Sequence, residues 1–243
     1  MAKNAPKKVM EDSEKNLTHI VFILDKSGSM YPLTKDTIGG FNSYLDKQKE
    51  ESTGEAVVSC YLFNTVTDVL YTNKDIKKAK HMTEKVYCAE GGTALYDAVG
   101  LAISQTTKNN ENIKPQKTLF VIMTDGMENS SREYSHKAIK ALIESKRKDA
   151  GWEFIFMGAN FEAEDFAESL GMDRKLAITY ECDEAGTELN FGSLHSITHV
   201  ARANMDLDCL IDSEDVNDSF EKIREYRNKK NNIADDEEDG EEA

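Results

Sequence analysis

Long apolar runs alternate with amphipathic segments along most of this chain. The runs contain few polar interruptions, which is typical of strands that are buried on both faces of a sheet. Four such strands are predicted, at 19–25 (HIVFILD), 117–125 (KTLFVIMTD), 152–159 (WEFIFMGA) and 175–181 (KLAITYE). Two further β-rich segments, 55–65 and 67–73, are separated by little more than a turn, so we expect them to pair antiparallel.

The segments between these runs have the periodicity of helices. In 91–108, apolar side chains recur at helical spacing, and Thr93 lies at or near the predicted N-cap. Apolar residues at comparable spacing predict helices at 34–52, 135–149, 162–171 and 191–204. Gly171 is the predicted C-cap of the helix at 162–171. Strands that alternate with helices predict an α/β fold with a doubly wound, mainly parallel sheet and helices on both faces. Such sheets place their sites beyond the carboxyl ends of the central strands.

Charge divides the chain into three parts. We expect a flexible polar leader at 1–17, one folded domain at 18–211 and a highly charged C-terminal segment at 212–243. Seven acidic residues fall in 235–243, and this acidic tail is predicted to be disordered.

Composition excludes several classes of protein. The net charge of −15 and the absence of a basic stripe argue against nucleic-acid binding. No apolar run approaches the ~18 residues that span a bilayer, and the first residues lack the apolar core of a signal peptide. The four cysteines are scattered, which favours reduced thiols in a cytoplasmic protein.

Oxygen-bearing side chains follow two of the predicted strands and precede one helix. The first strand ends in Asp25, followed by Ser27 and Ser29, and the 117–125 strand ends in Asp125. Thr93 begins the helix between them. All three loops belong to the carboxyl edge of the sheet, so their oxygens can converge. Two aspartates brought together would repel one another, and a divalent cation such as Mg²⁺, which prefers oxygen ligands, removes that repulsion.

Asp25-Lys26-Ser27-Gly28-Ser29 fits the Asp-x-Ser-x-Ser motif of von Willebrand factor type A (integrin I-like) domains. Thr93 and Asp125 occur in the order and strand context of that family's other metal-binding positions. The chain resembles the family over about 18–205, and is most similar to the small stand-alone members of bacteria and phages.

The resemblance implies a sheet with one antiparallel edge strand and a metal-ion-dependent adhesion site. There, Asp25, Ser27, Ser29, Thr93 and Asp125 would bind Mg²⁺ or Mn²⁺. An open coordination position would accept an Asp or Glu carboxylate from a partner protein, and the module would have no catalysis of its own.

Other interpretations of the same residues remain open. Asp25, Ser27 and Ser29 could form an ordinary strand-end turn with capping hydroxyls. Asp25 could instead be the nucleophile of a Mg²⁺-dependent phosphohydrolase, although Ser27 stands where phosphatases of the haloacid dehalogenase type have a second aspartate. A third possibility is a bacterial or phage accessory protein that self-assembles by placing its acidic tail on the metal of a neighbour.

Overall fold

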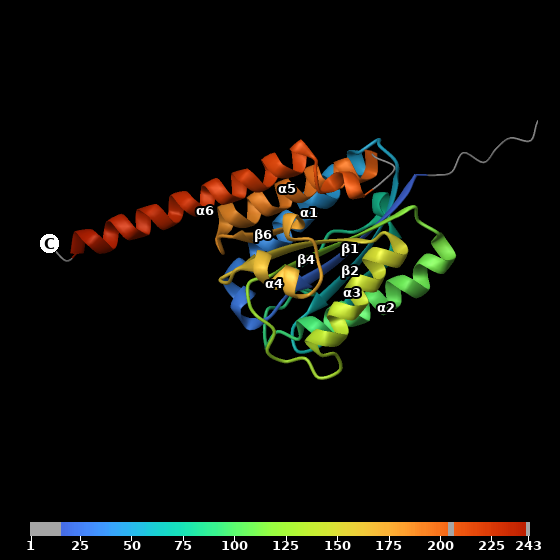
Figure 1. Ribbon diagram of the computed structural model, residues 1–243, viewed down its shortest axis with the longest axis horizontal. Helices are drawn as coiled ribbons and strands as arrows, with labels where there is room; N and C mark the ends of the chain where they lie inside the picture. The colour runs from blue at the N-terminus through green and yellow to red at the C-terminus, as the bar shows by residue number, and fades with distance from the viewer. Residues whose placement is uncertain (1–15, 204–206, 242–243) are drawn as a thin grey trace, which may run out of the picture.

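The computed structural model of the chain describes residues 16–203 and 207–241. At its centre lies a six-stranded sheet with the strand order β3-β2-β1-β4-β5-β6 (Figure 1). The strands are β1 (Leu17–Asp25), β2 (Glu55–Phe63), β3 (Thr67–Asp75), β4 (Lys117–Thr124), β5 (Glu153–Ala159) and β6 (Ala177–Tyr180). Only the edge strand β3 is antiparallel to its neighbour among these described strands. The predicted α/β fold, with one antiparallel edge strand, is confirmed.

Helices cover both faces of the sheet. One face packs against α1 (Thr34–Glu50), α5 (Glu184–Ala203) and α6 (Glu214–Glu241), and the other against α2 (Leu95–Ile113), α3 (His136–Ala150) and α4 (Ala163–Ser169). Short 3₁₀ helices at Gly28–Leu33, Ile76–Lys78, Arg174–Leu176 and Asp208–Leu210 complete the chain. Alternate side chains of β1 enter the two cores, because successive residues of a strand point to opposite faces. None of the described helices is long and apolar enough to cross a bilayer.

Two of the predicted helix starts need adjustment, and one predicted helix end does not. Helix α2 begins at Leu95 after Ala94 as its cap residue, so Thr93 is not the N-cap. Helix α5 begins at Glu184, several residues before the predicted start. Gly171 does close α4: its φ is +81°, a value that glycine adopts easily, and its N–H donates to the carbonyl of Glu168 (2.9 Å).

The C-terminal segment contains the helix α6. Helix α6 is continuous to Glu241, so the backbone of the acidic end is helical where disorder is predicted. The segment also belongs to the folded body, because Val216, Phe220 and Ile223 are buried in the core that α5 covers. Once packing fixes the N-terminal half of α6, each further residue adds a helical hydrogen bond without a new nucleation step. Most of the expected leader at 1–17 lies outside the described residues, although Leu17 is already part of β1.

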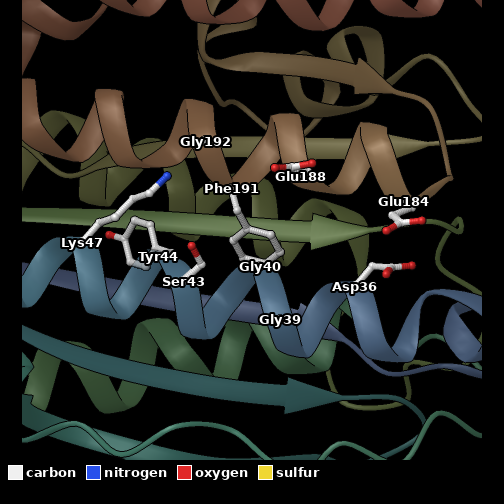
Figure 2. A pocket seen from close by; sticks show the side chains of 10 residues that line it. All are labelled: Asp36, Gly39, Gly40, Ser43, Tyr44, Lys47, Glu184, Glu188, Phe191 and Gly192. Atoms are coloured by element: carbon white, nitrogen blue, oxygen red, sulfur yellow. The ribbon is translucent and has the colours of Figure 1, made fainter.

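A close contact between two helices fixes the position of α5. In Figure 2, the Phe191 ring of α5 points toward Gly40 of α1. A Cβ atom built on Gly40 would lie 2.1 Å from the ring, whereas a Cβ on the adjacent Gly39 would meet no atom within 4 Å. The absence of a side chain at Gly40 therefore allows α1 and α5 to approach. A cavity of about 350 Å³ opens between the two helices beside this contact.

Candidate metal centre

The two aspartates end neighbouring strands in the middle of the sheet. Strands β1 and β4 are parallel, with Leu24 opposite Met123, so Asp25 and Asp125 leave the sheet at the same edge. The hydroxyl of Ser29, in the loop that follows β1, donates to Oδ1 of Asp125 (2.7 Å). Its oxygen also lies 3.1 Å from that of Ser27. Four of the five predicted ligands are thus brought together.

Hydrogen bonds hold the Asp25 carboxylate in one orientation. Its Oδ1 accepts from the backbone N–H of Ser27 (2.6 Å), and its Oδ2 accepts from the hydroxyl of Thr124 (2.5 Å). The backbone carbonyl of Asp25 accepts from the hydroxyl of Tyr87 (2.5 Å). Asp25 is buried, so these contacts replace the water that would otherwise solvate it.

Thr93 reaches the same place from a third loop. Its N–H donates to Oδ1 of Asn129 (2.9 Å), and its carbonyl accepts from the N–H of Asn129 (3.0 Å). A Cβ atom built on Gly126 would lie 3.7 Å from the Thr93 hydroxyl and 3.8 Å from the Ser29 hydroxyl. Both hydroxyls therefore face the backbone of Gly126, where no side chain fills the space. All five predicted residues lie together at this edge.

Burial disfavours negative charge on both aspartates. It raises the pKa of Asp25 to about 6, although the hydrogen bonds from Thr124 and Ser27 oppose the shift and the charge of Asp125 adds to it. Burial also raises the pKa of Asp125, against a hydrogen bond from Ser29. A bound cation would offset this cost, because an adjacent positive charge favours the ionised form of a carboxylate.

The donor set fits a hard cation. The five side chains offer two carboxylates and three hydroxyls. Mg²⁺ and Mn²⁺ prefer oxygen ligands of this kind, whereas zinc prefers nitrogen and sulfur donors. Within 16–203 and 207–241, no three His, Cys, Asp or Glu residues gather as a metal-binding group. Hydroxyl ligands would therefore have to complete any metal shell here.

Three residues that support the centre were missed by the sequence analysis. Thr124 and Tyr87 bond to Asp25 as described above, and the side-chain amide of Asn160 donates to the carbonyl of Asp125 (2.9 Å). Asn160 has a φ of +65° directly after β5, at the same edge of the sheet. A polar residue at the end of each apolar run was the available signal for Thr124 and Asn160, whereas nothing in the sequence places Tyr87 near Asp25.

Asp97 anchors the loop that follows Asp125. Its carboxylate accepts the backbone N–H groups of Arg132 (2.8 Å), Glu133 (2.9 Å) and Tyr134 (2.9 Å). These bonds tie the loop to the first turn of α2, two residues after its start at Leu95. Asp97 therefore supports the loop from behind, and the sequence alone identifies it as no more than an acidic residue of a first helical turn.

Comparisons with known proteins agree with this architecture. A von Willebrand factor type A protein from Catenulispora acidiphila superposes with a TM-score of 0.52 at 17% identity, covering 76% of this chain and 43% of the other. The vWF domain of the pilus tip protein Mfa5 from Porphyromonas gingivalis gives 0.56 at 11% identity, covering 78% and 97%. A comparison with curated proteins gives no match.

A third structure carries a metal. Proximal thread matrix protein 1 from the mussel byssus, described with a zinc-occupied MIDAS motif, gives a TM-score of 0.53 at 13% identity, covering 76% of this chain and 46% of that protein. The chain spans less than half of this protein and of the Catenulispora protein. At these identities the structural matches show the fold.

The sequence comparison defines the family more closely. The pattern of the family described as "VWA domain containing CoxE-like protein" matches residues 7–151, which is more than half of the chain and includes all five residues of the candidate centre. The chain therefore belongs to this family of von Willebrand factor type A domains.

Proposed function

We propose that the chain is a metal-dependent protein-interaction module. In this proposal Asp25, Ser27, Ser29, Thr93 and Asp125 bind Mg²⁺ or Mn²⁺, directly or through water. The observation that carries it is the Ser29 hydroxyl, which joins the loop of β1 to the carboxylate of Asp125 and so brings both aspartates to one point. The zinc-occupied MIDAS motif of the mussel protein supports a divalent cation at this position of the fold.

The donor set also supports binding of a partner's carboxylate. Two carboxylates balance the charge of one divalent ion, and the three hydroxyls add none. A cation whose protein ligands are partly neutral stays attractive to a further anion, because the ion remains the dominant local positive charge. An Asp or Glu side chain of a partner protein would then occupy a coordination position that the domain leaves to solvent.

The geometry is less suited to covalent catalysis by Asp25. Both carboxylate oxygens accept hydrogen bonds, and the side chain is only 1% exposed. A nucleophile needs an accessible oxygen facing its substrate. We therefore propose a binding role without turnover, which a panel of phosphate esters assayed with Mg²⁺ can test: hydrolysis lost in Asp25→Asn would overturn this part of the proposal.

The proposed place of action is the cytoplasm. No disulfide joins cysteines within residues 16–203 and 207–241, and Cys60 is buried in the core as a thiol. Reduced cysteines are typical of proteins in a reducing compartment. Fractionation of cells that express the full chain would test the assignment.

Calorimetry with Mg²⁺ tests the metal site directly. We expect binding by the wild type and no measurable heat with Asp25→Asn or Ser29→Ala. Glu90→Gln is a matched control, because it neutralises an exposed acidic residue near the same edge without changing any of the five. Equal heats in wild type and Asp25→Asn would refute the proposed site.

A further inference from the structure

Most of the exposed apolar side chains lie in loops at the sheet edge that carries the candidate metal centre. The large hydrophobic residues that are exposed in the described part of the chain are Tyr31, Val66, Val69, Val86 and Met127. Four of them belong to loops at the carboxyl edge of the sheet, and Val69 lies on the edge strand β3. Exposed apolar residues that cluster around a polar site indicate a surface for binding another protein.

The ligand-bearing loops themselves carry two of these residues. Tyr31 follows Ser29 by two residues and is 74% exposed, and Met127 follows Asp125 by two residues and is 58% exposed. Neither side chain supports the core. An aromatic ring held in water beside a buried acidic pair has no evident use for folding, since burial would stabilise it.

A groove begins beside this apolar rim. It has a volume of about 540 Å³ and lies between the 3₁₀ helix that contains Tyr31 and Pro32 and the segment that contains Glu84, Tyr87 and Cys88. Its size is within the range of protein pockets that enclose a ligand.

The segments that line the groove are bonded or adjacent in sequence to the loops of the metal centre. The hydroxyl of Tyr87, on its floor, donates to the carbonyl of Asp25 (2.5 Å). The next residues of the same segment bond to the loop of β1, through Gly28 N–H to the carbonyl of Gly91 (2.9 Å) and Glu90 N–H to the carbonyl of Lys26 (3.0 Å). One wall thus begins two residues after Ser29 and the other ends four residues before Thr93, which places the groove next to the ligand-bearing loops.

Charge restricts what can bind there. The chain carries a net charge of −15, which repels a strongly acidic segment that comes within a Debye length of its surface. A single carboxylate is attracted only by the local cation, and the remainder of the contact surface is largely apolar. Tyrosine at such a position is among the residues that contribute most to protein–protein affinity.

We propose that the partner of this centre presents one Asp or Glu beside a bulky aromatic or aliphatic residue, which binds in the groove between Tyr31 and Tyr87. The inference rests on the proposed function, because it assumes that a carboxylate occupies the metal. It adds a second recognition element that the five metal ligands do not provide.

Selection from random 12-residue peptides displayed on phage tests the inference. The full chain is used in Mg²⁺ buffer and bound phage are eluted with EDTA. We expect the selected peptides to contain an acid and an aromatic or aliphatic residue within about three positions of it. Synthetic versions should bind Tyr31→Ser about tenfold more weakly than wild type, which corresponds to about 1.4 kcal/mol, and should slow alkylation of Cys88 by iodoacetamide.

Val69→Thr is the matched control, because Val69 is exposed and apolar but lies outside the groove. Its affinity for the peptides should equal that of the wild type, and Mg²⁺ binding should be unchanged in both variants. Two results would overturn the proposed role of the groove while leaving the proposed function intact. One is selected peptides that are enriched in acids but show no apolar preference, and the other is equal peptide affinity of Tyr31→Ser and wild type.

Two further outcomes contradict the inference in other ways. If the chain binds Mg²⁺ but EDTA releases no acidic peptide, both the proposed carboxylate partner and the proposed role of the groove are wrong. Mg²⁺-dependent self-association that Tyr31→Ser abolishes would assign the groove to a second copy of the chain.

Discussion

The contact between Gly40 and Phe191 allows a test of how tightly the helices on one face are packed. Replacing Gly40 with alanine would place a Cβ atom 2.1 Å from the Phe191 ring, whereas carbon atoms in contact are normally about 3.5–4.0 Å apart. The ring is 3% exposed and belongs to the core between α1, α5 and the sheet, so a shift of the ring toward the adjacent cavity would break its contacts in that core.

The magnitude follows from two opposing effects. Overpacking a close-packed core costs about 1–3 kcal/mol, and a displacement of more than an ångström lies at the upper end of that range. Alanine in place of glycine inside a helix contributes about 1 kcal/mol in the opposite direction. We therefore expect Gly40→Ala to reduce the free energy of unfolding by about 2 kcal/mol. Gly39→Ala, which meets no atom within 4 Å, should increase it by about 1 kcal/mol.

Urea denaturation of the two variants measures this difference. A separation of about 3 kcal/mol corresponds to roughly 6–12 °C in Tm for a chain of this size. In a Phe191→Ala background the cost of Gly40→Ala should disappear, because the atom that it meets has been removed. Gly40→Ala that is as stable as Gly39→Ala, or a cost that persists without the ring, would refute the packing argument.

Three other predictions concern buried polar groups. Because burial raises the pKa of Asp25 to about 6, Mg²⁺ affinity measured by calorimetry should fall about fivefold from pH 6 to pH 5, and a constant affinity would contradict this. Thr124→Val removes the hydroxyl that bonds to Asp25 and should weaken Mg²⁺ binding about tenfold, whereas Thr118→Val, at the other end of β4, should leave it unchanged. Burial lowers the pKa of His19 from 6.5 to about 4, so the unfolded state binds the proton more tightly. The stability present above pH 6.5 should therefore be lost as the pH falls. Relative to His19→Gln, the wild type should lose about 3 kcal/mol between pH 6.5 and pH 4 in urea titrations, and parallel pH profiles would disprove it.

The sheet was the part of the fold most accessible from the sequence. Fully apolar runs such as 117–125 have few alternatives to a buried strand, and their alternation with helices fixes a small number of topologies. The convergence of Asp25 and Asp125 follows from that topology, because parallel strands end at one edge. The sequence leaves open whether the charged segment after residue 211 packs on the domain, because its composition does not reveal that Val216, Phe220 and Ile223 are buried.

The fine structure of the candidate centre was less accessible. The bond from Tyr87 to Asp25 spans 62 residues and depends on the path of an irregular segment, for which no periodicity exists. Thr93 illustrates a local ambiguity. The same residue type suits a helix cap and an oxygen ligand, and only the start of α2 at Leu95 shows that its side chain is not used as the cap.

The position of β1 and β4 at the middle of the sheet has a consequence for the metal-free protein. Their backbone groups are paired on both sides, and such central strands generally open to solvent only when the whole domain unfolds. Asp25 ends β1 and Asp125 directly follows β4, so both lie beside backbone amides that we expect to exchange most slowly. A chelator should leave the amide protons of both strands protected, and the centre should be organised before any ion arrives.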